Sequence, residues 1–528
     1  MRPSRSKAIL IAAVLLGSLT LPGLRAEEQK PVFEEWSILV IDGKQCGYGS
    51  TITTKTDTPT GPQYHTVLVQ ELVVKRIEIS MKVTETSKVT EDADGGVLSF
   101  EEQTSTFGSN IESSGVREGD DLVVSGRGQT KRYHVPRLTA LGPEKIRELT
   151  KAVPLKPGQP FAFTMFESEY PQSVVTQKGV IVGQETRNVR GVDRKLWKMT
   201  SELSILPGVT STTWVDDQGN DVEGLTPYAG LGELHQFAAT RAECMKEPEG
   251  VEVFTTSVVR PQRAIPSPSD LAQAVYRLTQ EGPDKKFLLW NKGEQRILSS
   301  TPGCCEVSVS APTISTSDVT WQLPHADTPE LHPFLQTTSY LEVSSPEIQA
   351  LAKEAVGGEK NPVKAAHRIE QFVSDYIIHK DMSVGFASAQ ETAKSREGDC
   401  TEHAVLCAAL GRAAGLPTRC VVGFGYLPPG VGDPALTNEV DDETGMFVGH
   451  MWAEAWVGPD QWVPMDAALH GFDVGHIAVM KTALEEVNPL VELLGPMNQV
   501  LQDLKVEVLK TTPKPGLNTG AAAKGTVP

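Results

Sequence analysis

An apolar stretch that follows Cys400 constrains the fold of this chain more than any other feature. Ala, Leu and Val dominate residues 404–414, and Gly415 and Pro417 then supply the usual punctuation after a helix. This pattern predicts a helix that begins near Cys400. The next residues, 417–426, read PTRCVVGFGY and predict a strand. Together with a β-rich pattern in the N-terminal half, this indicates the α+β fold class.

A cysteine at the start of a helix has chemistry that an interior cysteine lacks. The free backbone N–H groups of the first turn and the positive end of the helix dipole both favour the thiolate over the thiol. One of those N–H groups can also face an oxyanion. Cys400, which follows Gly398-Asp399, is therefore the candidate nucleophile. The alternative is a structural cysteine at a helix start.

A hairpin further along the chain supplies two partners for this thiol. Residues 447–457, FVGHMWAEAWV, predict a strand, and residues 460–466, DQWVPMD, predict its pair across a Gly-Pro-Asp turn. Such a hairpin brings Asp466 beside His450 and lets His450 face the helix that carries Cys400. The three residues then match a nucleophile, a general acid/base and a carboxylate that fixes the imidazole tautomer.

The same segments resemble a known family. Residues from about 335 to 475 are similar to the transglutaminase-like superfamily, whose fold is papain-like. The matching pieces are G-D-C-T-E-H-A (398–404), G-L-P-T-R-C-V-V-G-F (415–424), G-H-M-W-A-E-A-W-V (449–457) and W-V-P-M-D (462–466). The resemblance implies that Cys400 is the nucleophile, His450 the general acid/base and Asp466 the orienting residue. It implies less about activity, because the superfamily includes cross-linking enzymes, proteases, amidases and catalytically inactive proteins.

Other side chains near the motif have a functional and a structural interpretation. Gln390 precedes Cys400 by ten residues, and its amide could donate to an oxyanion. Trp452 shares a strand face with the candidate histidine, where it either flanks the site, with a possible part in binding an oxyanion, or packs in the core. We interpret Glu454 as structural. His403 forms Cys-x-x-His with the candidate nucleophile, but no second ligand pair has compatible spacing, so we predict no metal site and no bound cofactor.

The cysteine count agrees with a catalytic thiol but does not require one. The chain has seven cysteines, at positions 46, 244, 304, 305, 400, 407 and 420. Seven is too few for a disulfide-built scaffold, and an odd number leaves at least one thiol unpaired within the chain. Buried free cysteines are also common. We interpret the adjacent Cys304 and Cys305 as structural, because a bond between neighbours is strained.

Changes of pattern divide the chain into five parts. β-branched residues, as in 67–89, and the turn signal Asp94-Gly95-Gly96 predict strands in the first half, as two related units or as one long curved antiparallel sheet. Helical periodicity begins near residue 346. The predicted parts are a signal peptide (1–26), a β-rich region (27–259), a linker and small mixed segment (260–334), a transglutaminase-like domain (335–485) and a C-terminal extension that is disordered at its end (486–528).

The N-terminus has the pattern of a secretory signal peptide. Arg2, Arg5 and Lys7 form a basic start, Ala8–Leu21 is apolar, and Ala26 suits the position before a cleavage site. The apolar run is shorter than the ~20 residues that cross a bilayer, so we expect cleavage rather than a retained anchor. The predicted location is the periplasm or the exterior of a bacterial cell, without stable membrane insertion.

The formal net charge of −18 disfavours nucleic acid and anionic lipid as partners. The family resemblance implies a protein or peptide substrate. We predict an exported cysteine-dependent enzyme that acts on protein or peptide carboxamides through a thioester, by amine transfer or by hydrolysis. Two alternatives stay open. One is a non-catalytic binding module whose functional part is the β-rich half. The other is an envelope scaffold that keeps a papain-like fold for interaction alone.

Overall fold

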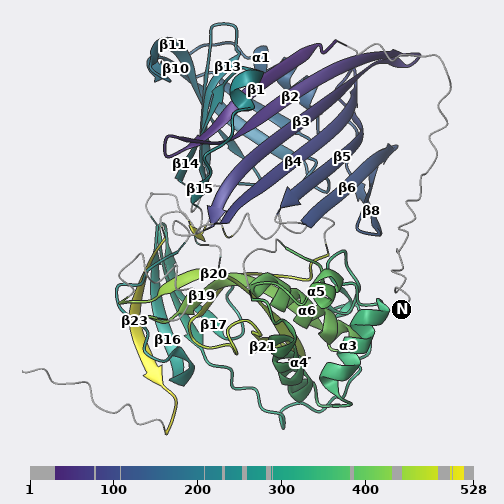
Figure 1. Ribbon diagram of the computed structural model, residues 1–528, viewed down its shortest axis with the longest axis vertical. Helices are drawn as coiled ribbons and strands as arrows, with labels where there is room; N and C mark the ends of the chain where they lie inside the picture. The colour runs from purple at the N-terminus through teal and green to yellow at the C-terminus, as the bar shows by residue number, and fades with distance from the viewer. Residues whose placement is uncertain are drawn as a thin grey trace, which may run out of the picture.

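The computed structural model has a β-rich N-terminal half next to a mixed C-terminal half of strands and helices (Figure 1). It describes residues 30–516 apart from 77–78, 107–108, 207–208, 229–231, 253–257, 281–286, 288, 381–385, 431–442, 486–496, 498–499 and 502–503. The predicted signal peptide and residues 517–528 of the predicted disordered end lie outside the described residues. Within those ranges, no helix is both long and apolar enough to cross a membrane.

One sheet of fifteen strands makes up the N-terminal half of the described chain. Its order is β8-β7-β6-β5-β4-β3-β2-β1-β14-β13-β12-β11-β10-β9, and β15 pairs with β3 outside this path. The strands are β1 (Phe33–Ile41), β2 (Lys44–Thr58), β3 (Gly61–Arg76), β4 (Ile79–Asp92), β5 (Val97–Thr106), β6 (Ser109–Glu118), β7 (Asp121–Gly126), β8 (Gln129–His134), β9 (Pro160–Met165), β10 (Val175–Val189), β11 (Val192–Leu203), β12 (Thr210–Val215), β13 (Asp221–Tyr228), β14 (Gly232–Ala238) and β15 (Val251–Glu252). The antiparallel β1–β14 pair joins the early strands to the late ones in a single continuous sheet.

Tight turns explain why consecutive strands of this sheet pair with each other. A two-residue hairpin turn needs positive φ at both central residues, which glycine adopts at little cost. Arg127 and Gly128, with φ of 44° and 76°, connect β7 to β8 in this way, and Arg190 and Gly191, at 52° and 86°, connect β10 to β11. Among the described residues of this half, two helices interrupt the strands, α1 (Pro143–Lys151) and α2 (Arg241–Cys244).

The C-terminal half contains two antiparallel four-stranded sheets and four helices in its described residues. The sheet orders are β17-β18-β16-β23 and β21-β20-β19-β22. The strands are β16 (Leu271–Thr279), β17 (Gln295–Thr301), β18 (Cys304–Ser310), β19 (Thr418–Leu427), β20 (Met446–Gly458), β21 (Gln461–Met465), β22 (His476–Thr482) and β23 (Lys505–Pro513). The helices are α3 (Pro346–Val356), α4 (Pro362–Tyr376), α5 (Ala389–Ser395) and α6 (Cys400–Ala413), with short 3-10 turns η1 (Pro268–Asp270) and η2 (His332–Phe334).

A single hydrophobic core joins both of these sheets to the helices. Tyr276 of β16 is fully buried, packs edge-on against Phe447 of β20 at 5.6 Å, and donates a hydrogen bond of 2.7 Å to the carbonyl of Val474. The boundary expected from the sequence between a small mixed segment (260–334) and a separate domain (335–485) therefore falls inside one packed core.

Helix α6 is the central helix of this half. Eleven of its fourteen residues are buried, because helices and the β19–β20 sheet pack around it. The predicted helix start near Cys400 is confirmed, and so are the predicted strands that carry His450 and the residues just before Asp466. The structure is therefore β-rich, with its main helices in the C-terminal half, as the sequence pattern indicated.

The tip of the β7–β8 hairpin connects the two halves. The Arg127 guanidinium lies 4.5 Å from the centre of the Tyr340 ring and forms an ion pair of 3.0 Å with Glu391 of α5. The Gln129 side chain donates to the carbonyl of Thr337 at 3.1 Å. The β-rich half thus contacts the segment that leads into α6.

Candidate active site

Cys400 is the first residue of α6, and a capping box fixes this helix start. The Asp399 carboxylate accepts the N–H of Thr401 at 2.9 Å, and the Glu402 carboxylate accepts the N–H of Asp399 at 2.9 Å. These bonds provide acceptors for two backbone N–H groups at the N-terminus of the helix. The arrangement holds the Cys400 backbone in one conformation against the neighbouring sheet.

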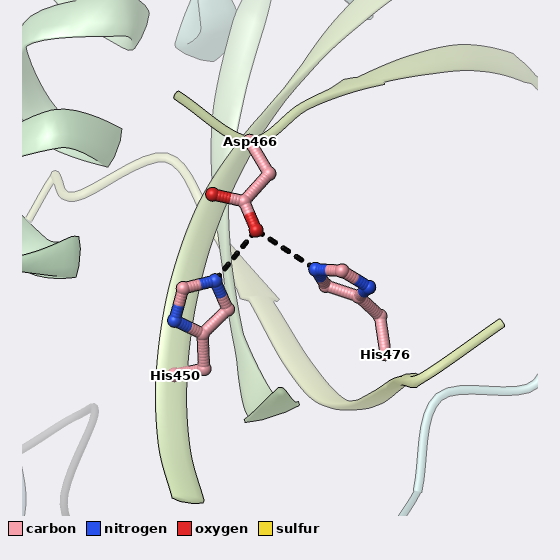
Figure 2. A group of neighbouring side chains, drawn as sticks. All are labelled: His450, Asp466 and His476. Atoms are coloured by element: carbon pink, nitrogen blue, oxygen red, sulfur yellow. Dashed lines mark hydrogen bonds and ion pairs between the residues drawn. The ribbon is translucent and has the colours of Figure 1, made fainter. Parts of the chain in front are cut away.

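His450 lies on β20, where it pairs with Gly423 of β19. Its Nε2 donates a hydrogen bond of 2.7 Å to Oδ2 of Asp466, and both side chains are buried (Figure 2). Gly425 leaves room for the ring, because a Cβ at that position would lie 3.0 Å from Cγ and Cδ2 of the imidazole. The sequence prediction that a hairpin brings Asp466 beside His450 is confirmed by this bond.

Asp466 follows the end of β21 and accepts four hydrogen bonds. Its Oδ1 takes the backbone N–H groups of Ala468 and Leu469, at 3.0 and 3.1 Å. Its Oδ2 accepts hydrogen bonds from His450 and from a second histidine, His476, which is 2.8 Å away. Burial acts to raise the pKa of Asp466, but the hydrogen bonds and charges of the two histidines outweigh it and hold the pKa well below its ordinary value. Asp466 is therefore a carboxylate in the folded protein.

His476 is the member of this cluster that the sequence analysis missed. It opens β22, is buried, and binds Asp466 through Nε2 (Figure 2). Its Nδ1 lies 3.2 Å from Oδ1 of Asp473. Burial alone would lower the pKa of His476, but the bonds to Asp466 and Asp473 raise it to about 9. At neutral pH the ring is therefore an imidazolium next to the Asp466 carboxylate.

Cys400 lies against the strand that carries His450. The backbone N–H of Met451, the residue after His450, is close enough to the thiol to act on its pKa. Burial raises the pKa of Cys400 well above its ordinary value, the carboxylates of Asp399 and Glu402 raise it further, and the Met451 N–H acts in the opposite direction. The sequence argument expected the helix start to favour the thiolate. In the structure burial and nearby carboxylates dominate, so the resting side chain is a thiol.

The His450, Asp466 and His476 ligand atoms meet within 4.8 Å of one another, as they would around a metal ion. The two Nε2–Oδ2 distances are 2.7 and 2.8 Å. Ligands of a tetrahedral zinc, each about 2.0–2.1 Å from the ion, lie roughly 3.3 Å apart. The observed distances are those of direct hydrogen bonds.

The remaining predicted site residues lie at different distances from this cluster. Trp452 is buried, with its ring 6.0 Å from that of His450 and 5.2 Å from that of His476, and it packs with Val421 and Ala478. Its indole N–H has no hydrogen-bond partner among the described atoms. Trp452 therefore both packs in the core and borders the candidate triad.

Gln390 is the second residue of α5, and its backbone N–H donates to Glu342 at 3.2 Å. In the described part of the chain, no hydrogen bond joins its side chain to the triad. His403 is buried on α6, where its Nδ1 lies 2.6 Å from the carbonyl oxygen of Asp399. Glu454, interpreted from the sequence as structural, forms buried ion pairs with Arg419 and Lys481.

Comparison with known proteins assigns the region around the triad to a family. Residues 349–467 match the profile of the transglutaminase-like superfamily. No curated protein matches the chain. Among solved structures, the chain is similar to a proposed cysteine protease from Cytophaga hutchinsonii, with 17% identity and a TM-score of 0.30 over 42% of this chain and 83% of that chain.

Two further solved structures are similar to the chain. A β-barrel-like protein of a domain of unknown function from Brucella abortus has 16% identity and a TM-score of 0.29 over 39% of this chain and 95% of that one. A proposed protease from Parabacteroides distasonis has 12% identity and a TM-score of 0.18 over 71% of this chain and 69% of that one. The assignment of the domain rests on the family profile. Residues 349–467, which contain Cys400, His450 and Asp466, form a transglutaminase-like domain.

Proposed function

We propose that this protein is an exported cysteine-dependent enzyme that acts on carboxamides of proteins or peptides through a thioester on Cys400. The observation that carries the proposal is the bond of 2.7 Å between His450 and Asp466, on the strand against which the Cys400 thiol lies. The proposal includes a papain-like arrangement of this domain, supported by the transglutaminase-like family profile and by a nucleophile at the start of a central helix.

The bond to Asp466 determines which nitrogen of His450 is available as a base. Its Nε2 is bound to Asp466, so Nδ1 is the ring nitrogen left to accept a proton (Figure 2). Because burial raises the pKa of Cys400, little thiolate is present before substrate binds. We therefore infer that the thiol transfers its proton to His450 as sulfur attacks the amide carbonyl, which is general base catalysis.

The reaction then follows in balanced steps. The Cys400 sulfur forms a bond to the carbonyl carbon, and the tetrahedral intermediate collapses as the C–N bond breaks. His450 returns the proton to the leaving nitrogen, which departs as ammonia from a glutamine side chain or as an amine from a peptide bond. An amine or a water molecule then attacks the thioester, passes its proton to His450 and releases Cys400 as a thiol. An amine yields a new amide bond, and water yields a carboxylic acid.

Export rests on the predicted signal peptide of residues 1–26, and the location follows as periplasmic or extracellular. In those compartments a free nucleophilic thiol must avoid oxidation. The half-buried position of Cys400, and a pKa that keeps it protonated, both slow oxidation because the thiolate is the reactive form. The same thiol state also suits the alternative function, a catalytically inactive envelope protein that binds a partner.

Trapping the acyl-enzyme distinguishes the proposed enzyme from a catalytically inactive envelope protein. The mature protein is incubated with a glutamine-containing peptide, quenched in acid and measured by intact mass, with Cys400→Ala as the matched control. An active enzyme gains the peptide mass less one ammonia on Cys400, and an added primary amine discharges the adduct as an amide. Absence of the adduct and of ammonia release across glutamine and ordinary peptide substrates would support the inactive scaffold.

A further inference from the structure

The β-rich half contains a cavity of about 350 Å³ between α1 and one face of the sheet. Alternate residues of a strand share a face, and residues two apart on four neighbouring strands form the cavity floor. Helix α1 lies on one side, and the segment just after β9 closes another. The volume is at the lower end of the roughly 300–1,000 Å³ typical of small-molecule sites.

Three carboxylates line this cavity without a bonding partner. Glu35 of β1, Glu167 after β9 and Asp221 of β13 form no hydrogen bond or ion pair through their side chains with any described residue. Burial raises the pKa of Glu35 and of Glu167 to about 7. It also raises the pKa of Asp221, which is the exposed member of the three. For the two glutamates an ionised form without a donor is unfavourable, so a cation that enters the cavity would be stabilised beside them.

The two basic side chains of the cavity wall already have partners. Arg147 forms a two-bond ion pair with Glu144 and stacks 4.5 Å from the Phe33 ring centre. The Lys151 ammonium donates to Asn220 at 3.0 Å. Within the described residues, neither cation forms an ion pair with the other three carboxylates, although both act to lower the pKa of Glu35 and Lys151 acts to lower that of Asp221. Because Arg147 is paired with Glu144, those three carboxylates share the cavity wall with one further cation, Lys151. The cavity wall therefore has more acidic than basic groups.

The spacing of these carboxylates favours an organic cation over a metal ion. Calcium requires six to eight oxygen ligands at about 2.3–2.6 Å, which forces several carboxylates close together. In the described chain, the cavity carboxylates do not form a set of three ligand atoms within 4.8 Å. Apolar side chains, including Leu68, Val89, Met165 and Phe166, also line the wall and suit a hydrocarbon chain.

We propose that this cavity is a binding site for a small organic cation, a primary ammonium group on an apolar chain, with Glu35, Glu167 and Asp221 as the counter-charge. The apolar wall holds the chain, and the carboxylates hold the ammonium group. This site lies in the β-rich half and does not depend on the thioester chemistry proposed for Cys400.

Calorimetry with n-pentylamine tests the proposal. The mature chain carries Cys400→Ser, so that no acyl-enzyme chemistry contributes heat. Pentanoate and 1-pentanol have the same apolar chain with a negative and a neutral head group. We expect saturable binding of the amine, weaker binding of the alcohol and no binding of the acid. Equal binding of the amine and the alcohol would show that the carboxylates play no part, and no binding of any probe would overturn the site.

Isosteric variants separate the cavity from the rest of the acidic surface. Glu167→Gln and Glu35→Gln keep the side-chain shape and remove the charge, and each should weaken amine binding by about tenfold or more, the effect of losing one charged hydrogen bond. Glu249→Gln is the matched control, because Glu249 is exposed and outside the cavity. Thermal melts identify any variant that does not fold. If one of the two glutamate variants fails to fold, amine binding by the other one tests the proposal. Unchanged amine binding in a folded cavity variant, or an equal loss in Glu249→Gln, would refute the proposal.

Discussion

His476 donates a hydrogen bond of 2.8 Å to Oδ2 of Asp466, the same oxygen that accepts His450. A triad carboxylate with one histidine exerts its whole negative charge on that histidine. Here the imidazolium of His476, whose pKa is raised to about 9, neutralises part of that charge at neutral pH. In the proposed mechanism His476 therefore acts on His450 through Asp466, as a positioning residue.

Replacing His476 should change the pH dependence of turnover. In His476→Gln the neutral amide still fills the site, but the imidazolium that offsets the charge of Asp466 is gone. We expect kcat/KM of the wild type to change as the pH rises through about 9, where His476 loses its proton, and this change to be absent in the variant. A purely structural role would lower activity equally at all pH values and leave this change in place.

The hydrogen-bonded pair of His476 and Asp466 should make the stability of the fold depend on pH. Because the pKa of His476 is higher in the folded protein than its ordinary value of 6.5, the folded state holds a proton that the unfolded state releases. This contribution, on the order of a few kcal/mol, is fully present below about pH 6.5 and is lost as the pH rises through about 9. Urea unfolding of the wild type should show a loss of stability between these values, and His476→Gln should flatten it. A wild-type curve that stays level across this window would contradict the charged state of His476.

Cysteine labelling tests how the thiol of Cys400 is activated. Among the seven cysteines, Cys304 and Cys400 are partly exposed and the others are buried. We expect brief iodoacetamide treatment to label both, and His450→Gln to slow the labelling of Cys400 several-fold, because its proton acceptor is gone. Cys304 lies on β18 and should react at the same rate in both proteins. Mass mapping measures the two sites together, and an equal effect on both would show that His450 does not activate Cys400.

Local patterns were enough to predict that Cys400 begins a helix and that Asp466 lies beside His450, but not what surrounds these residues. The start of α6 at Cys400 and the pairing that brings Asp466 to His450 depend on a helix end signal and a short hairpin, which a sequence displays directly. His476 reaches Asp466 because β22 pairs with β19 on the far side from β20, and no short-range motif encodes that pairing. The raised pKa of Cys400 follows in the same way from burial by elements distant in sequence.

The domain boundary predicted near residue 335 shows a similar limit of prediction from local sequence patterns. The change to helical periodicity near residue 346 is real, since α3 begins at Pro346. However, the preceding β16 and β18 contribute Tyr276, Leu278 and Val307 to the core of the helical region, and β23 adds Val506 from the C-terminal side. A change of secondary structure type along the chain thus does not mark the edge of a packed unit.

Truncation provides the last prediction. A fragment of residues 335–485 contains the whole triad but lacks β16, β17, β18 and β23, so several fully buried side chains of the shared core have no partners. Loss of buried large apolar residues costs about 2–5 kcal/mol each, which exceeds the stability of most domains when several are missing. We expect this fragment to show no cooperative melt, while residues 258–516 unfold cooperatively and keep the Cys400 thiol. The longer fragment still lacks the Arg127 contact to Tyr340 and Glu391, so any remaining difference from the full chain measures how far the β-rich half supports the segment before α6. A cooperative melt of residues 335–485, with a labelling rate at Cys400 equal to that of the full chain, would contradict this prediction. It would show that the segment around Cys400 folds without the sheet of β16, β17, β18 and β23 and without the β-rich half.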